Sequence, residues 1–288
     1  MTSTGRVAVV TDSTASLPAG LVAATGVRVV PLHVVIDGVD HREGVDLTTA
    51  ELVAALRSGA AVSTAQPGPE AFARAYALAV ADGAQAIVSV HLSGELSGTV
   101  AAARLAVDAA GVPVHVVDSR TVGMSLGLGV VAAARRAARA PDGGDAEAVA
   151  RLAAERSGAA SVHFAVDTLE HLRRGGRLGS VAAAVGTVLG VRPLLTVRGG
   201  RLEVVEKVRT SARARERLVE LALADAATRQ RYDLAVHHLG EHALAAGLVE
   251  RLRAACPPGL RDVHVAEISA VVGAHVGPGL AAVVVADA

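Results

Sequence analysis

The segment QAIVSVHLSGELSGTVAAARLAVDAAG, residues 85–111, decides the fold class. It opens with small and β-branched residues, which are typical of a buried strand, and it ends with an Ala-rich run, which favours a helix. Between these two parts, residues 91–100 contain two serines, two glycines and a threonine. A strand that passes through a short turn into a helix is the unit from which parallel sheets covered by helices are built.

The same alternation continues through the first half of the chain. RVAVVTDST (6–14) and VPVHVVDS (112–119) are predicted strands, and GPEAFARAYALAVADG (68–83) is a predicted helix. These elements predict an α/β fold. Its N-terminal domain, residues 1–157, has three layers, α/β/α, around a parallel sheet.

Local signals add three expectations in this half. Asp37 and Gly38 predict a tight turn after a strand. Thr48 and Glu51 have the spacing of a capping box at the start of a helix. Ser16 is a candidate N-cap residue for an earlier helix, in which Pro18 would occupy the first turn.

The second half of the chain has a different order of predicted elements. LLTVRGGRLEVVEKV (194–208) predicts a hairpin that turns at Gly199 and Gly200, and later strands are separated by helices. Hairpins mixed with crossovers predict a C-terminal α/β domain with a mixed sheet, residues 158–288. RAPDGGD (139–145) has the composition of a linker near the end of the first domain.

Composition excludes several classes of function. The 28 basic residues balance 28 acidic ones, and aromatic residues make up 1% of the 288, so no nucleic-acid partner is expected. Cys256 is the only cysteine, which excludes an internal disulfide and a cysteine metal cluster. The N-terminus lacks the features of a signal peptide, and no apolar run reaches the ~18 residues that a membrane span needs. We therefore expect a cytoplasmic protein without a metal or cofactor.

The turn at residues 91–100 is a candidate anion site. Unpaired N–H groups at a helix N-terminus attract phosphate or carboxylate, and small glycines with hydroxyl-bearing neighbours allow close approach. Two other turns have the same character, TDSTASLP (11–18) and VSTAQPGP (62–69), and His275 lies among glycines in GAHVGPGL (273–280). The alternative is plain capping, in which Ser97 or Thr99 closes the end of the helix.

Motifs for catalysis or nucleotide binding are lacking. GLGVVA (127–132) fits a dinucleotide pattern but falls inside a predicted helix, and no Walker A sequence is present. GELSG (94–98) is not a nucleophile elbow. His238 and His242 bridge a predicted strand end and a helix start, which does not favour a metal site. We expect no catalytic residue.

Six short motifs carry a resemblance to a known family. In chain order they are TDSTASLP (11–18), VSTAQPGP (62–69), HLSGELSGT (91–99), LRRGGRLGS (172–180), EKVRTSAR (206–213) and HVGPG (275–279). Each alone is weak, but the ordered set resembles the DegV family over nearly the whole chain. The second serine that the family pattern has after Ser93 is Gly94 here, so the head-group network loses a hydroxyl.

The resemblance implies a long-chain fatty acid held in a tunnel between the two domains. It also implies that the protein is a binding subunit rather than an enzyme, and we expect this subunit to be a monomer. A separate ATP-binding fatty acid kinase subunit then phosphorylates the presented carboxylate. Transient membrane contact for lipid exchange is compatible with this role. The apolar segment SVAAAVGTVLGV (180–191) is a candidate tunnel wall.

The resemblance assigns the carboxylate to Thr64 and Ser93, with His275 nearby and Arg209 near the head group. The full set of expected ligand-binding residues is Ser63, Thr64, Ser93, Gly94, Ser97, Arg209 and His275. The expected contacts for the kinase, or for control of ligand access, are Arg173, Arg174 and Arg177.

Two other functions stay open at the sequence level. The first domain also resembles the substrate domain of dihydroxyacetone kinases, which implies a subunit of a small-carbonyl or polyol phosphotransferase. The other alternative is a structural or regulatory module in which the polar turns are only helix caps.

Overall fold

The computed structural model describes residues 6–139, 144–179, 181 and 191–288. The chain divides into two compact units, one made of Met1–His33 and Ala65–Gly158 and the other of Val34–Thr64 and Ala159–Ala288. The second unit thus includes residues 34–64, which the expected boundary after residue 157 assigns to the first domain. The linker-like segment 139–145 lies largely outside the described residues.

The first unit is built on four parallel strands in the order β2-β1-β6-β7. The strands are β1 (Val7–Asp12), β2 (Arg28–Val30), β6 (Ala86–His91) and β7 (Val114–Asp118). All six residues of β6 are buried, as expected for a central strand with both faces covered. The predicted parallel sheet of the N-terminal domain is confirmed.

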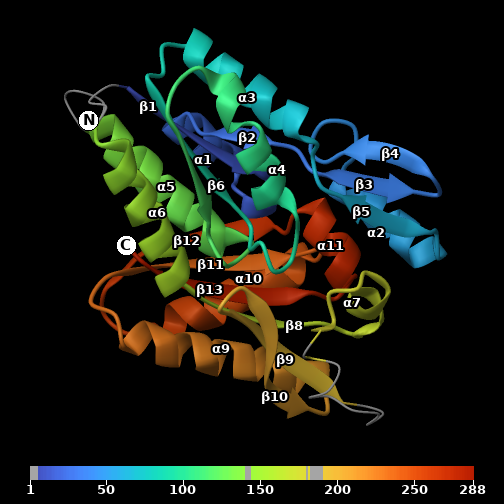
Figure 1. Ribbon diagram of the computed structural model, residues 1–288. Helices are drawn as coiled ribbons and strands as arrows, with labels where there is room; N and C mark the ends of the chain where they lie inside the picture. The colour runs from blue at the N-terminus through green and yellow to red at the C-terminus, as the bar shows by residue number, and fades with distance from the viewer. Residues whose placement is uncertain (1–5, 140–143, 180, 182–190) are drawn as a thin grey trace. The chain divides into compact units, whose positions relative to one another are not determined.

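Helices cover both faces of this sheet. They are η1 (Ser13–Ala15), α1 (Ala19–Thr25), α3 (Pro69–Ala81), α4 (Thr99–Leu105), η2 (Val107–Ala110), α5 (Met124–Arg139) and α6 (Ala146–Ala159). α3 and α4 lie on one face and α5 on the other (Figure 1). Phe72 and Tyr76 of α3 pack in one hydrophobic core with Val10 and Ile87 of the sheet, so this core joins the sheet to the helix layer of α3 and α4.

The expected N-cap at Ser16 is wrong. α1 begins at Ala19, its N-cap residue is Pro18, and no side chain caps it. Ser16 ends η1 instead, in the left-handed conformation with φ of 51°. The chain leaves β1 through a turn that Asp12 organises, and Ser16 belongs to that turn.

The second unit contains a six-stranded mixed sheet in the order β10-β9-β8-β13-β11-β12. Its strands are β8 (Ser161–Ala165), β9 (Arg192–Arg198), β10 (Arg201–Val208), β11 (Tyr232–His238), β12 (Leu260–Glu267) and β13 (Ala281–Asp287). β11 and β12 are parallel, and the other neighbours are antiparallel. Gly199 and Gly200 have φ of 58° and 90°, which confirms the predicted turn of the hairpin between β9 and β10.

The remaining described strands form a three-stranded sheet in the order β4-β3-β5. It consists of β3 (His33–Ile36), β4 (Val39–Arg42) and β5 (Val62–Ala65). Asp37 and Gly38 join β3 to β4 with φ of 48° and 85°, so the predicted tight turn is confirmed.

Three helices of the second unit, α2, α7 and α11, contribute residues to the candidate site. The helices of this unit among the described residues are α2 (Thr49–Ser58), α7 (Glu170–Arg174), α9 (Ser211–Ala227), α10 (His242–Ala255) and α11 (Ala270–Val276). Both halves of the predicted capping box, Thr48 and Glu51, are present at the start of α2. α9 and α10 share one hydrophobic core with the six-stranded sheet.

Close packing holds α11 against α2. A Cβ atom at Gly273 would lie 2.9 Å from Leu239 and 3.1 Å from Leu52 of α2, so the absence of a side chain lets these leucines approach the helix. This contact ties residues 34–64 to the C-terminal part of the chain. Within the described ranges, no helix is long and apolar enough to cross a bilayer.

Candidate functional site

The second unit contains a cavity of about 750 Å³, within the range of small-molecule binding sites. Its apolar lining is Val35, Leu56, Ala60, Ala61, Val62 and Ala274. Its polar lining is Ser63, Thr64, His171, Arg174, Arg177 and His275. The cavity therefore brings together five residues that the sequence singles out, from β5, from α11 and from the segment that begins with α7.

Thr64 and His275 are a hydrogen-bonded pair of side chains in this lining. Thr64 Oγ1 lies 2.9 Å from His275 Nε2, although the two residues are 211 positions apart. Burial lowers the pKa of His275 to about 4, and the charge of Arg177 acts in the same direction. The imidazole is therefore neutral at pH 7, and the pair offers a hydroxyl and a ring nitrogen without a formal charge.

The arginine segment divides into two parts. Arg174 and Arg177 line the cavity, whereas Arg173 is not among the described lining residues. Arg173 and Arg174 both bind Glu170, with Arg173 Nε at 2.8 Å and Arg174 Nε at 2.9 Å, which lowers the pKa of Glu170 to about 2. Arg177 Nη1 donates to the carbonyl of Gly175 at 2.6 Å. The lining thus contains the charged side chains of Arg174 and Arg177 as well as neutral hydroxyl groups.

Ser93, Gly94 and Ser97 lie in one turn of the first unit, between β6 and α4. Ser93 is fully buried, its carbonyl accepts from the N–H of Ser97 at 3.1 Å, and its Oγ accepts from the N–H of Glu95 at 3.2 Å. The N–H of Gly94 donates to the carboxylate of Asp118 at 3.2 Å. The turn is therefore held by a backbone hydrogen bond, by the Ser93 hydroxyl and by the carboxylate of Asp118.

The simple capping alternative for this turn is wrong. The N-cap residue of α4 is Gly98, with no side-chain cap bond, and Ser97 Oγ and Thr99 Oγ1 bond to each other at 2.9 Å. A Cβ at Gly94 would lie 2.9 Å from Asp118 Oδ2, so the serine of the family pattern would require that carboxylate to move.

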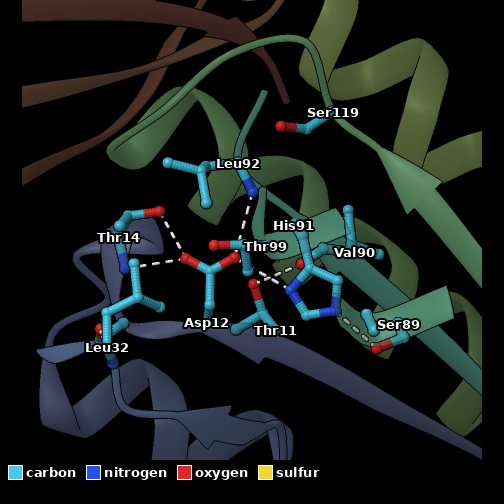
Figure 2. Close-up of polar contacts among 12 residues, drawn as sticks. Thr11, Asp12, Thr14, Leu32, Ser89, Val90, His91, Leu92, Thr99 and Ser119 are labelled. Carbon is cyan, nitrogen blue, oxygen red and sulfur yellow. Dashed lines mark hydrogen bonds and ion pairs between the residues drawn. The ribbon is translucent and has the colours of Figure 1, made fainter. Parts of the chain in front are cut away.

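Asp12 organises the carboxyl end of the sheet in the first unit (Figure 2). Its Oδ1 accepts from the N–H and hydroxyl of Thr14, and its Oδ2 accepts from His91 Nδ1 at 2.9 Å and from the N–H of Leu92 at 3.1 Å. Asp12 and His91 are both fully buried. With two donors on each oxygen the carboxylate is satisfied, so its role is to position the residues that precede Ser93.

A chain of hydrogen bonds continues from His91 into the core. Ser89 Oγ lies 2.7 Å from His91 Nε2, and the Tyr76 hydroxyl donates to Ser89 Oγ at 2.9 Å. Burial raises the pKa of Tyr76, which keeps the phenol protonated as a donor. This polarity makes His91 Nε2 the acceptor and leaves Nδ1–H to donate to Asp12. The hydrogen-bonded arrangement of Asp12, His91 and Ser89 resembles a catalytic triad. Ser89 is fully buried, however, so its hydroxyl stabilises the core.

The TDST turn also connects neighbouring loops. Ser13 Oγ accepts from the N–H of Leu32, and the carbonyl of Thr14 accepts from the N–H of Gly123 at 2.8 Å. Together with the bond from Asp12 to Leu92, these contacts fix the ends of three segments. The TDST motif therefore holds neighbouring segments in place, a role that its hydroxyl content alone does not reveal.

Other expected residues lie outside the cavity. Arg209 is exposed in the turn between β10 and α9 and is not among the described lining residues. The proposed apolar wall, 180–191, lies outside the described residues apart from Val181 and Val191. His238 ends β11 and His242 begins α10, and no group of three or more candidate metal ligands occurs among the described residues.

Sequence reasoning missed two lining residues of the α7 segment. His171 and Gly175 belong to the HLRRGG stretch, which drew attention only for its arginines. The contact between α7 and α11 brings both residues to the cavity. The apolar residues Val35 and Leu56 gave no signal, because strands and helices throughout the chain contain such residues.

Comparisons with known proteins match this chain over nearly its whole length. A model of the DegV family matches residues 6–288. A DegV domain-containing protein of Streptomyces coelicolor is 47% identical over 98% of this chain and 99% of its own length. A solved structure of a DegV family protein from Thermus thermophilus, described for its fatty acid binding, is 36% identical with a TM-score of 0.90. The match covers 98% of this chain and 100% of that one.

A second solved structure, DegV from Bacillus subtilis, is described as a fatty acid binding protein. It is 29% identical with a TM-score of 0.88, and the match covers 99% of this chain and 100% of that one. The parallel sheet of the first unit and the mixed sheet of the second define a two-unit α/β protein. The chain belongs to the DegV family.

Asp12→Asn tests the organising role of the carboxylate. An amide keeps the shape of the side chain but replaces one oxygen with a donor, which leaves a buried donor such as His91 Nδ1–H or the N–H of Leu92 unpaired. Each buried donor left unpaired costs about 1–3 kcal/mol, so the free energy of unfolding should fall by at least that amount in chemical denaturation. The exposed Asp108→Asn is the matched control. A wild-type stability for Asp12→Asn would contradict the role.

The low pKa of His275 predicts a pH dependence of stability. The folded pKa of about 4 lies below the ordinary value of 6.5, so the unfolded chain binds a proton first as the pH falls. Stability from this residue is complete above pH 6.5 and is lost between pH 6.5 and 4, by up to about 3 kcal/mol. His275→Gln should flatten the measured profile in that interval. Between pH 7 and 8 the difference between the two proteins should be constant, and an unchanged slope below pH 6.5 would count against the assignment.

Proposed function

We propose that this chain binds one long-chain fatty acid and presents its carboxylate to a separate ATP-dependent kinase, which forms the acyl phosphate. The observation that carries the proposal is the hydrogen-bonded pair of Thr64 and His275 in a cavity that is lined on one part by apolar side chains of β3, α2 and β5. The fatty-acid-binding relatives from Thermus thermophilus and Bacillus subtilis support the same ligand class.

Apolar burial supplies most of the affinity for such a ligand. Each methylene that leaves water contributes about 0.8 kcal/mol, so a long acyl chain outweighs one polar anchor. The polar pair then decides orientation, because a carboxylate that is buried without hydrogen-bond donors is strongly destabilised. A few polar groups within an apolar lining are the usual composition of a small-molecule site.

The neutral imidazole suits a carboxylate that must react. In the Nε2–H tautomer, His275 donates to Thr64 Oγ1, which leaves the hydroxyl hydrogen of Thr64 to donate to a carboxylate oxygen. A bidentate guanidinium pair would hold the same carboxylate more tightly and reduce its nucleophilicity. Arg174 is already engaged by Glu170, and Arg177 by the carbonyl of Gly175, which limits such pairing.

The phosphoryl donor belongs to a partner in this proposal. Lys207 is the only lysine, and it lies in EKVRT rather than in a glycine-rich phosphate-binding loop. The resemblance to the DegV family assigns the carboxylate to Ser93 of the first unit as well as to Thr64, and both hydroxyls are therefore tested below.

Native mass spectrometry of the purified protein, followed by denaturing lipid extraction, tests the ligand. One fatty acid per chain is expected. Thr64→Ala and Ser93→Ala should each weaken the Kd for that fatty acid by about 10–100-fold, because a hydrogen bond to a charged group is worth about 1.5–3 kcal/mol. Thr64→Ser keeps the hydroxyl and is the matched control. Wild-type protein that carries no lipid and takes up neither palmitate nor oleate would reject the proposal.

The kinase step is tested with the lipid-loaded protein, Mg-ATP and the purified ATP-binding fatty acid kinase subunit of the same organism. Acyl phosphate, trapped as the hydroxamate and identified by mass spectrometry, should form only when both proteins are present. Arg173→Ala should lower the rate several-fold without changing the Kd for the fatty acid, since exposed Arg173 is a candidate docking contact. Arg253→Ala, at an exposed position of α10, is the control. Product formation without the partner protein would show that the chain is itself the enzyme.

A further inference from the structure

Two histidines and two glycines make crossed contacts between the α7 segment and the α11 segment. A Cβ atom at Gly175 would lie 2.0 Å from His275 Nδ1, and one at Gly277 would lie 2.2 Å from His171 Cδ2. Real Cβ atoms essentially never approach another heavy atom within 3.0 Å. Each imidazole therefore occupies the space that a side chain on the opposite segment would need.

The two glycines differ in their backbone. Gly277 has φ of 74°, a left-handed conformation that favours glycine whatever its surroundings. Gly175 has φ of −73° and ψ of −5°, which any residue adopts without strain. Conformation does not require a glycine at position 175, and the ring of His275 is the main obstacle to a side chain there, since the next group, the carbonyl oxygen of His171, would lie 3.2 Å from the Cβ.

Gly175 also holds a second polar group of the cavity. Its carbonyl accepts the hydrogen bond from Arg177 Nη1 at 2.6 Å, while its Cα faces the imidazole that bonds to Thr64. One backbone position thus fixes a ring nitrogen and a guanidinium that line the same cavity.

We infer that Gly175 is the positioning residue of the carboxylate-recognition groups: the absence of its side chain lets His275 Nε2 reach Thr64 Oγ1. A Cβ at this position displaces Nδ1 by at least about 1 Å, the difference between 2.0 Å and the 3.0 Å limit. A shift of that size is enough to break a hydrogen bond of 2.9 Å. The inference deepens the proposed function, because it names what sets the geometry of the fatty-acid head-group site.

Gly175→Ala is the direct test, with Gly247→Ala of α10 as the matched control. A Cβ at Gly247 meets no atom within 4 Å, so this control should behave as wild type or be slightly more stable. NMR of the histidine ring nitrogens in ligand-free protein follows His275. In Gly175→Ala its ring signals should shift and its pKa should rise from about 4 toward 6.5. The Kd for the fatty acid should weaken about 10–100-fold.

Two double variants separate positioning from general damage to the fold. In Gly175→Ala with Thr64→Ala, the Kd should equal that of Thr64→Ala alone, since both changes remove the same hydrogen bond. The double variant Gly175→Ala with His275→Ala should have the same free energy of unfolding as His275→Ala alone, because the ring that met the added methyl group is gone. This rescue is measurable by denaturation even where the single variant is poorly folded.

The outcomes distinguish this inference from the proposed function. Unchanged His275 signals in Gly175→Ala, additive losses of affinity with Thr64→Ala, or failure of the stability rescue would each overturn the positioning role. If wild-type protein binds no fatty acid while the His275 signals still shift in ligand-free Gly175→Ala, the proposed function fails and the positioning of the ring by Gly175 stands.

Discussion

The hydrogen bond between Thr64 and His275 is the contact on which the cavity of the second unit depends. It joins β5 to α11 across 211 residues of sequence, and the packing of Leu52 against Gly273 supports the same junction. Residues 34–64 belong to the second unit because of contacts of this kind, although they are flanked in sequence by strands of the first. The neutral imidazole then gives the cavity a polar pair that carries no charge.

A second constraint acts in the first unit, where the carboxylate of Asp12 receives two donors on each oxygen. Two hydroxyl-rich segments therefore serve different purposes in this chain, one a turn after β1 and the other strand β5. In the TDST turn the polar atoms bind one another and neighbouring backbone. In VSTAQPGP, Ser63 and Thr64 line a cavity. Hydroxyl content alone therefore does not decide which of the two purposes a segment serves.

Two glycines leave room for polar side chains of neighbouring segments. Gly175 admits the ring of His275, and Gly94 avoids the carboxylate of Asp118. In the proposed fatty-acid carrier such positions matter as much as the hydroxyls, because a carboxylate is recognised only when its donors converge on it. The proposed division of work, with binding in this chain and nucleotide chemistry in a partner, rests on a cavity lined by both apolar and polar side chains and on a sequence without a Walker A motif.

The sequence by itself determined the features that depend on near neighbours. The turns at Asp37-Gly38 and Gly199-Gly200, the capping box of Thr48 and Glu51, and the change from a parallel to a mixed sheet all follow from local propensity and spacing. The ordered motifs also identified the DegV family. Only the tertiary structure decided that residues 34–64 join the second unit, that Thr64 meets His275, and that Gly175 must lack a side chain. The physical reason is that these contacts join residues far apart in the chain, and local patterns cannot specify which packed elements meet or how deeply a ring is buried.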